Sequence, residues 1–199
     1  LAQNILPFAR QYLDWYDSLL TKKEFADVTY NAGITKDHPY TWGYRNTHKL
    51  FNTNLGFQFQ PDSKEFIDYL KSKAIEFFEY LGYECNVSKL QINSFVSEMN
   101  IGDSHNIHSH PGSDISGVFY LNIPEKSASL GIADPRSHYY ALPPLVKFKK
   151  NKTTKYKENI LVLPPQQGDI LMWEGWVPHS VSKNLSKGRV TIVFNIKVM

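Results

Sequence analysis

The sequence predicts a mostly β protein, a sandwich or jelly roll, with helices at its N-terminal end. Two features support this fold class. Helical spacing of apolar residues is confined to the first 85 residues or so, and the rest of the chain consists of short runs rich in β-branched and aromatic residues. Because no linker divides these parts, we expect one domain over residues 1–199, in which residues 1–85 form a helical and irregular buttress and residues 86–199 form the β core.

Two segments of the first part predict helices. Residues 5–20 and 63–81 both carry apolar residues at helical spacing, and Gly82 is a stop signal after the second segment. Between them, residues 30–60 are rich in Asn, Gly, Thr and aromatic residues. That composition predicts mostly loop, with one short helix near Thr47.

The second part of the chain predicts a series of short strands. Pro, Gly and Asn separate runs of Val, Ile, Leu, Phe and Tyr, which is the punctuation typical of β proteins. The predicted strands are residues 90–98, 116–122, 129–133, 159–163, 169–173, 177–181 and 189–198.

The composition is that of a globular protein. Hydrophobic residues make up 42% and charged residues 21% of the chain, and the formal net charge is +3. Lysines gather at residues 147–157, where Asn and Thr interrupt them. We interpret this segment as a solvated loop, with an anionic partner as the alternative. A small molecule or a peptide is therefore a more favoured partner than nucleic acid.

Cys85 is the only cysteine, so no disulfide can form within the chain. This cysteine usage is typical of a reducing compartment, and we expect the cytoplasm of the producing or host cell. No apolar run approaches the roughly 20 residues that a membrane-spanning helix needs. We expect no membrane partner.

A histidine pair carries the clearest chemical signal. His108 and His110 are separated by one residue, so on an extended strand both side chains point to the same face. Two imidazoles on a rigid strand can chelate a metal ion, and a third ligand from a distant strand would leave coordination positions open. By itself, such a pair is more often a set of surface or hydrogen-bonded histidines.

Two later segments favour the metal site. Residues 168–181 have the pattern of a strand, a Gly/Pro turn and a second strand that His179 begins. Residues 188–195 then predict a strand with Arg189 at its start and Thr191 on the same face. A guanidinium beside a hydroxyl is suited to gripping a carboxylate.

These segments resemble the iron(II)- and 2-oxoglutarate-dependent dioxygenases, in particular the prolyl-hydroxylase-like branch found in phage and marine bacterial proteins. The resemblance covers about residues 90–198. It rests on four ordered motifs, namely HSHPGSDISGVFYLN (108–122), GIADPR (131–136), residues 168–181 and RVTIVFN (189–195). It implies a double-stranded β-helix core and a non-haem iron enzyme that couples decarboxylation of 2-oxoglutarate to hydroxylation of a substrate.

The resemblance also implies individual roles. His108 and His179 would be iron ligands, and His110 stands where the superfamily usually has Asp or Glu. The 2-oxoglutarate site would be formed by Tyr120, Arg189 and Thr191. The substrate implied by this branch is a peptidyl proline, with an amino acid or another small molecule as alternatives.

The identity of the third ligand stays open at this point. His110 is favoured, but Asp114 would supply a carboxylate if a turn swung it inward, and His105 is expected beside the metal or facing the substrate. Several aromatic residues could line a substrate cleft, although any one of them is more often a core or rim residue. Residues 137–154 form a long connection typical of a lid. The aromatic candidates are Phe119, Tyr139, Tyr140, Trp173 and Trp176.

Two other functions fit parts of the pattern. A cupin-type metalloenzyme would use His108, His110, Asp114 and His179 as ligands without 2-oxoglutarate, which leaves Arg189 without a role. A non-catalytic jelly-roll binding module would use the histidines for packing or for a structural metal.

Overall fold

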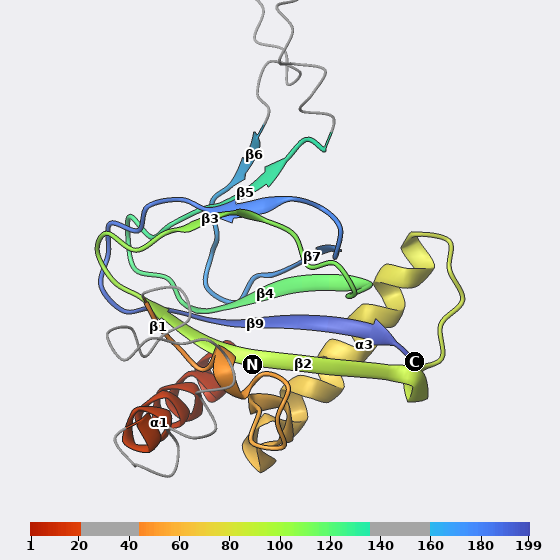
Figure 1. Ribbon diagram of the computed structural model, residues 1–199, viewed down its shortest axis with the longest axis horizontal. Coiled ribbons are helices and arrows are strands. Elements are labelled where there is room, and N and C mark those ends of the chain that lie inside the picture. The colour runs from red at the N-terminus through yellow and green to blue at the C-terminus, as the bar shows by residue number, and fades with distance from the viewer. Residues whose placement is uncertain (21–43, 136–159) are drawn as a thin grey trace, which may run out of the picture.

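The computed structural model describes residues 1–20, 44–135 and 160–199, and its core is a pair of antiparallel sheets (Figure 1). The larger sheet has the order β1 (Arg45–Asn46), β2 (Leu90–Met99), β9 (Arg189–Val198), β4 (Ile115–Asn122) and β7 (Ile170–Glu174). The smaller sheet has the order β3 (His105–His108), β8 (His179–Val181), β5 (Leu130–Ala133) and β6 (Ile160–Leu163).

The strand order confirms the predicted fold class. From β2 to β9 successive described strands alternate between the two sheets, except that β5 and β6 are neighbours in the smaller sheet. This order is that of a jelly roll, the double-stranded β-helix. The two sheets face each other, so their inner faces enclose the space in which a site can form.

Two helices cover the outer face of the larger sheet (Figure 1). They are α1 (Ala2–Leu20) and α3 (Lys64–Tyr80), close to the predicted segments. Gly82, with φ of 86°, ends the second helical segment because only glycine adopts this conformation readily. The short helix expected near Thr47 is η1 (His48–Leu50), and further 3-10 turns are η2 (Phe57–Phe59), η3 (Pro61–Ser63) and η4 (Val87–Lys89).

Alternation along the strands divides the interior into two apolar clusters. In β4, Phe119 and Leu121 pack toward the helices, whereas Val118 and Tyr120 face the space between the sheets. In β9 the helix-facing residues are Val190, Ile192, Phe194 and Ile196. Because side chains alternate along a strand, the intervening residues of β9 face the inner space.

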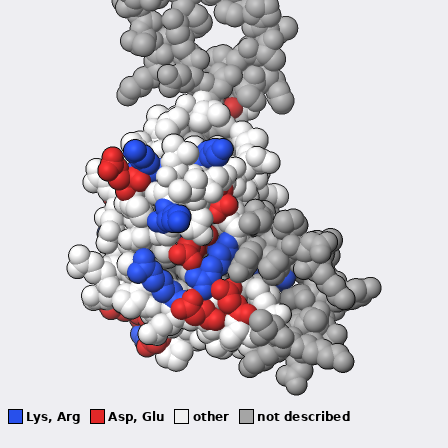
Figure 2. Space-filling view, turned by 90° about the vertical axis from the view of Figure 1, so that its left-hand side faces the viewer, with Lys and Arg blue, Asp and Glu red and all other residues white. Residues whose placement is uncertain are grey.

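Arg45 joins the helical layer to the larger sheet. Its guanidinium pairs with Asp14 and with Asp17 (2.7 Å) of α1 and with Glu98 (2.7 Å) of β2. On the described part of the face in Figure 2, basic and acidic residues are intermixed and form no area of a single sign. Helices in the described ranges lack the length and apolar character that a membrane crossing requires.

The strands agree with the predicted segments to within one or two residues at most boundaries. The largest difference concerns residues 177–181, where β8 begins only at His179, because Val177 and Pro178 still belong to the preceding turn. The expected lid, with Tyr139, Tyr140 and the lysine-rich segment, lies outside the described residues.

Gly117 is predicted to be essential for the packing of the larger sheet. A Cβ atom there would lie 2.3 Å from the ring of Phe194 and 2.7 Å from the backbone oxygen of Leu171, which has little freedom to move. We expect Gly117→Ala to lower the free energy of unfolding by about 1–3 kcal/mol, as overpacking does. Urea denaturation measures this.

Gly131→Ala is the matched control, because its added Cβ would approach only side-chain atoms of Ile160 and Ser180 within 3 Å (both 2.9 Å). Side chains can adjust, so the loss should be smaller than for Gly117→Ala. Equal losses in the two variants would contradict the role assigned to the backbone contact.

Candidate metal centre

Three histidines converge between the two sheets. One potential ligand atom from each of His108, His110 and His179 lies within 4.8 Å of the others. His108 ends β3 and His179 begins β8, and the two are direct partners in the antiparallel pairing of these strands. The ring centroids of this pair are 4.3 Å apart. A metal ion placed among the three rings would therefore be held by residues that the fold itself brings together.

The backbone structure that positions His110 differs from the one that the sequence predicts. The expectation of one extended strand carrying both histidines is wrong, because β3 ends at His108. The backbone N–H of His110 instead donates to the carbonyl of Gly175 (2.8 Å), which follows β7. A Cβ at position 175 would lie 2.2 Å from the carbonyl oxygen of Ser113, so a glycine is needed for this close approach.

Two of the rings are oriented by backbone carbonyls. Nδ1 of His108 lies 2.8 Å from the oxygen of Asn106, and Nδ1 of His179 lies 3.0 Å from the oxygen of Val177. A carbonyl only accepts, so each Nδ1 carries the proton and donates it. In the neutral ring this leaves the lone pair on Nε2, which is the atom available to a metal ion.

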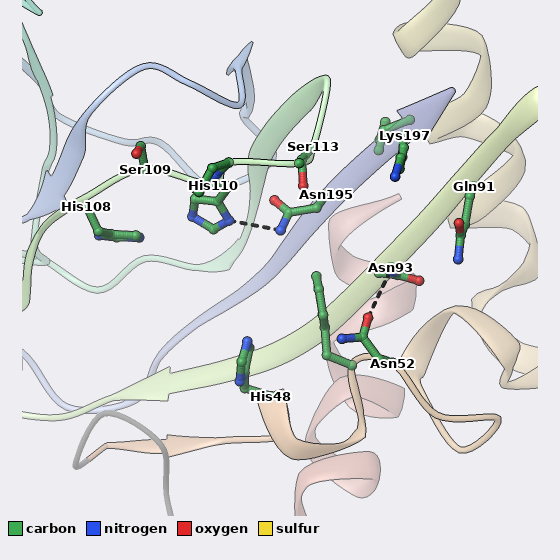
Figure 3. A pocket seen from close by; sticks show the side chains of 14 residues that line it. His48, Asn52, Gln91, Asn93, His108, Ser109, His110, Ser113, Asn195 and Lys197 are labelled. Carbon is green, nitrogen blue, oxygen red and sulfur yellow. Dashed lines mark hydrogen bonds between the residues drawn. The ribbon is translucent and has the colours of Figure 1, made fainter. Parts of the chain in front are cut away.

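The third ring contacts a side chain instead. Nδ1 of His110 lies 2.9 Å from Nδ2 of Asn195 on β9, as Figure 3 shows. The other nitrogen, Nε2, is buried and has no hydrogen-bond partner among the described residues. A buried unsatisfied nitrogen costs stability, and coordination of a metal ion would satisfy it. The residues present therefore fit a metal ion.

The ligand group among the described residues contains no carboxylate. Asp114, the alternative third ligand, accepts a hydrogen bond from the backbone N–H of Val198 (2.8 Å) through Oδ2 and is not in the group. Imidazole nitrogen suits iron, zinc, copper and nickel, and three protein ligands leave positions open for small molecules. The arrangement can hold a catalytic metal ion.

Two further histidines flank the group. His105 stacks on His108 with ring centroids 4.0 Å apart, and its Nδ1 lies 3.2 Å from the hydroxyl of Tyr44. This places His105 beside the candidate ligands, as expected. His48 of η1, which the sequence analysis missed, faces the same region from below in Figure 3. An isolated histidine in a loop gives no sequence signal for such a position.

Burial keeps these imidazoles neutral near pH 7. It lowers the pKa of His105 to about 3 and the pKa values of His48, His110 and His179 to about 4. In His105 and His110 the neighbouring histidines act in the same direction, because a second positive charge nearby disfavours protonation. Neutral rings can bind a metal ion without first losing a proton.

Arg189 lies at the base of a small inner cavity between the sheets. It is 2% exposed, its Nη1 contacts the sulfur of Met99 (3.4 Å), and its Nε has no hydrogen-bond partner among the described residues. The guanidinium carbon lies 5.4 Å from the centroid of the Tyr120 ring. Tyr120 and Thr191 line the same cavity, so the structure brings together all three residues predicted for the co-substrate.

The chemistry of this cavity suits a carboxylate. Burial lowers the pKa of Arg189, although its guanidinium stays a cation. Burial raises the pKa of Tyr120 to about 12, so its phenol keeps the proton. No described residue forms a salt bridge with Arg189 at the distances found for the other ion pairs. The Nε of Arg189 and the hydroxyl of Tyr120 have no hydrogen-bond partner among the described residues, and an acidic ligand would supply an acceptor.

A second, open cavity of about 400 Å³ adjoins His108 and His110 (Figure 3). His108 and His110 line both this groove and the inner cavity of about 50 Å³. The described residues that line the groove carry mainly uncharged polar side chains, and none of them is acidic. Its labelled residues include His48, Asn52, Gln91, Asn93, Asn195 and Lys197.

The three aromatic candidates for a cleft that lie in the described residues occupy three different places. Trp173 lines the inner cavity, with its ring centroid 4.7 Å from that of His179. Phe119 lies on the outer face of the sheet, stacked on Phe66 (5.2 Å), so it is a core residue and does not line a cleft beside the histidines. Trp176 is 56% exposed and lines a separate groove with Cys85.

The lowered histidine pKa values predict that the metal-free protein loses stability in acid. The ordinary pKa is 6.5 and the folded values are about 4 or lower for four rings, so between these pH values the unfolded chain binds protons that the folded chain does not. Stability therefore falls as pH falls through this window. Urea unfolding at pH 7 and pH 5 should differ by about 2 kcal/mol or more, after allowance for solvent screening.

His48→Gln removes one of these groups, and its unfolding free energy should depend less steeply on pH. A wild-type unfolding free energy that stays constant between pH 7 and pH 5, in the presence of a chelator, would show that the rings are not buried as neutral groups.

Comparison with known proteins agrees with this geometry. A family model described as "Putative 2OG-Fe(II) oxygenase" matches residues 93–195, which is more than half of the chain. The matched segment begins in β2 and ends in β9, so it includes the three histidines, Tyr120 and Arg189. No protein with a curated description matches the chain.

Several solved structures are similar at low identity. An oxidoreductase of the 2OG-Fe(II) oxygenase family from Burkholderia pseudomallei is 13% identical with a TM-score of 0.49, and the alignment covers 69% of this chain and 58% of that one. A prolyl-4-hydroxylase from Pseudomonas putida is 13% identical with a TM-score of 0.47, covering 70% and 68%.

The viral collagen prolyl hydroxylase of Paramecium bursaria Chlorella virus-1 is 16% identical with a TM-score of 0.48, covering 90% of this chain and 93% of that one. Such distant similarity says nothing about the substrate of this chain. The match to the family model does establish the family, because it spans most of the jelly roll and the whole histidine group. The chain belongs to the 2OG-Fe(II) oxygenase family, whose cofactor is iron(II) and whose co-substrate is 2-oxoglutarate.

Proposed function

We propose that the protein is a 2-oxoglutarate-dependent dioxygenase that hydroxylates a small molecule or a peptide at an iron(II) centre held by His108, His110 and His179. The observation that carries the proposal is the position of the three rings, with Nε2 of each left for a metal ion. They lie at the boundary between a cavity with a buried cation and a groove that opens to solvent. A metal ion there would meet a co-substrate on one side and a substrate on the other.

In this proposal the inner cavity binds 2-oxoglutarate. Arg189 pairs with the far carboxylate, and the hydroxyls of Tyr120 and Thr191 donate hydrogen bonds to it. The cavity, at about 50 Å³, is smaller than 2-oxoglutarate, so the flexible side chain of Met99 must move from the guanidinium as the carboxylate arrives. The exchange replaces a weak thioether acceptor with an ionic one.

Iron and 2-oxoglutarate together supply the oxidising power for attack on a C–H bond. The residues of the chain hold these groups in place and keep water from the inner cavity. Val118, Leu130, Trp173 and Val193 form most of its apolar wall. A dry wall strengthens the pairing of Arg189 with a carboxylate, because the effective dielectric constant is lower than in water.

The open groove is the proposed substrate site. Asn52, Gln91 and Asn93 offer both donors and acceptors along its floor, and Lys197 is the one Lys, Arg, Asp or Glu residue among the described residues that line it. Because none of its described lining residues is acidic, the groove favours a neutral or anionic substrate over a cationic one. A peptidyl proline, a free amino acid and other small molecules with a carboxylate all satisfy this condition.

A cupin-type reaction without 2-oxoglutarate receives less support from the site. It would use Asp114 as a fourth ligand, whereas this carboxylate binds the backbone at the end of β9. It would also leave the buried cation Arg189 unpaired.

We expect Arg189→Met to weaken 2-oxoglutarate binding by about 2–4 kcal/mol, the usual cost of losing one partner of a buried charged pair. Calorimetric titration of the metal-loaded protein measures this. The free energy of unfolding without ligand should stay the same or rise, because the guanidinium is buried without an anionic partner among the described residues.

Lys187→Ala is the control, since it removes an equal charge two positions away on an exposed side chain. It should leave 2-oxoglutarate affinity unchanged. An Arg189→Met protein that binds 2-oxoglutarate like the wild type would contradict the proposed co-substrate site.

Succinate release tests the whole proposal. With Fe(II), O₂ and 2-oxoglutarate, a panel of peptides, amino acids, nucleotides and other small molecules should include a compound that raises the release of succinate and gains one oxygen atom by mass spectrometry. His179→Ala should lose both the activity and the metal, because it removes one of three ligands. Metal-loaded protein that neither binds 2-oxoglutarate nor releases succinate would exclude the function.

A further inference from the structure

The third candidate ligand differs from the other two in what holds its ring. His108 and His179 each donate Nδ1–H to a backbone carbonyl, which only accepts. Their tautomer is therefore the same with and without metal. His110 contacts the carboxamide of Asn195, which has a donor at one end and an acceptor at the other. The tautomer of His110 thus depends on which end of Asn195 faces it.

Ser116 determines that orientation in the metal-free protein. Its hydroxyl lies 2.8 Å from Oδ1 of Asn195 and donates to it. Ser116 and Asn195 are direct partners in the pairing of β4 with β9, so the two strands hold this contact. With Oδ1 turned to Ser116, Nδ2 of Asn195 faces the ring and donates to Nδ1 of His110. The ring proton of neutral His110 is then on Nε2, the buried atom that has no partner.

That tautomer cannot bind a metal ion through Nε2. Coordination needs the lone pair on Nε2 and moves the proton to Nδ1, which then needs an acceptor. A half-turn of the Asn195 carboxamide supplies one, since it brings Oδ1 to His110 and Nδ2 to Ser116. The hydroxyl of Ser116 can accept as well as donate, so both arrangements are fully hydrogen-bonded.

We infer that Asn195, held by Ser116, is the positioning residue that sets the tautomer of His110 and that its carboxamide turns when the metal ion binds. The inference rests on the proposed function, in that His110 is taken as a metal ligand. Asn195 also lines the open groove, and the inferred role in setting the tautomer is separate from any contact with a substrate there.

The test uses Co(II) as a stable, coloured probe of the site. Chelator-treated protein is titrated with Co(II), and binding is followed by visible absorption and by calorimetry. We expect Asn195→Ala to weaken Co(II) binding about 10–100-fold, the usual effect of losing a partner of a metal-bound histidine. Asn195→Asp should bind at least as tightly as the wild type, because a carboxylate accepts Nδ1–H without turning. Ser116→Ala should weaken binding less than Asn195→Ala.

Asn93 offers a matched control on the neighbouring strand. It is the direct partner of Asn195 in the β2–β9 pairing and lines the same groove, but its side chain donates to Asn52 (3.1 Å) and lies away from the labelled histidines in Figure 3. Asn93→Ala should leave Co(II) affinity unchanged. Asn93→Asp places a negative charge in the same groove and separates the effect of charge from that of the hydrogen bond.

A second readout reports the tautomer directly. Two-bond ¹H–¹⁵N NMR correlations of the imidazole rings should show His110 protonated at Nε2 in the metal-free wild type and at Nδ1 in the Zn(II)-loaded protein. In metal-free Asn195→Asp the proton should already be on Nδ1. A purely structural role for Asn195 would change thermal stability without moving this proton.

Three results would overturn the inference: Co(II) affinity in folded Asn195→Ala equal to the wild type, Asn195→Asp as weak as Asn195→Ala, or a metal-free wild type already protonated at Nδ1 of His110. A wild-type protein that binds no Co(II), or that binds it equally well after His108→Ala, would instead overturn the proposed metal centre. The two failures are therefore distinguishable.

Discussion

The pairing of β3 with β8 is the interaction on which the site depends. It sets His108 directly opposite His179, although the two residues are far apart in the sequence. Facing residues of an antiparallel pair have Cβ atoms about 4.5–5.5 Å apart, which suits two ligands of one metal ion. The third histidine follows from this pairing, because the loop after β3 is held against Gly175 at the end of β7. A rigid strand pair and one glycine contact thus place all three rings.

Strand β9 connects the site to the rest of the core. Its alternation turns Val190, Ile192, Phe194 and Ile196 toward the helices, while Arg189, Thr191 and Asn195 face the histidines and the inner cavity. The apolar face of the strand packs against the helices and stabilises the fold. That packing fixes the register of β9 and so the positions of the residues on its polar face. A shift of one residue would exchange the two sets, burying charged and amide groups among the apolar side chains.

The charge of the site follows from its residues. The candidate ligands among the described residues are neutral rings, and burial keeps their pKa values below the physiological range. Asp114, the nearest carboxylate in the motif, serves instead to hold the backbone at the end of β9. The buried positive charge of Arg189 is therefore not balanced by a salt bridge within the described part of the chain. An acidic co-substrate is the partner that would balance it.

Features that depend on local pattern could be predicted from the order of residues alone. Helical spacing predicted α1 and α3, and short apolar runs predicted every described strand except β1 and β3. The ordered motifs predicted the residues that meet at the site, namely His108, His110, His179, Tyr120, Arg189 and Thr191. Folding in three dimensions is what puts His110, and not Asp114, in the group of candidate ligands, places Phe119 on the outer face of the larger sheet, and brings His48 and Asn195 to the histidines. Those outcomes depend on which strands become neighbours and on how a turn directs its side chains, and neither is encoded in the spacing of residues along one segment.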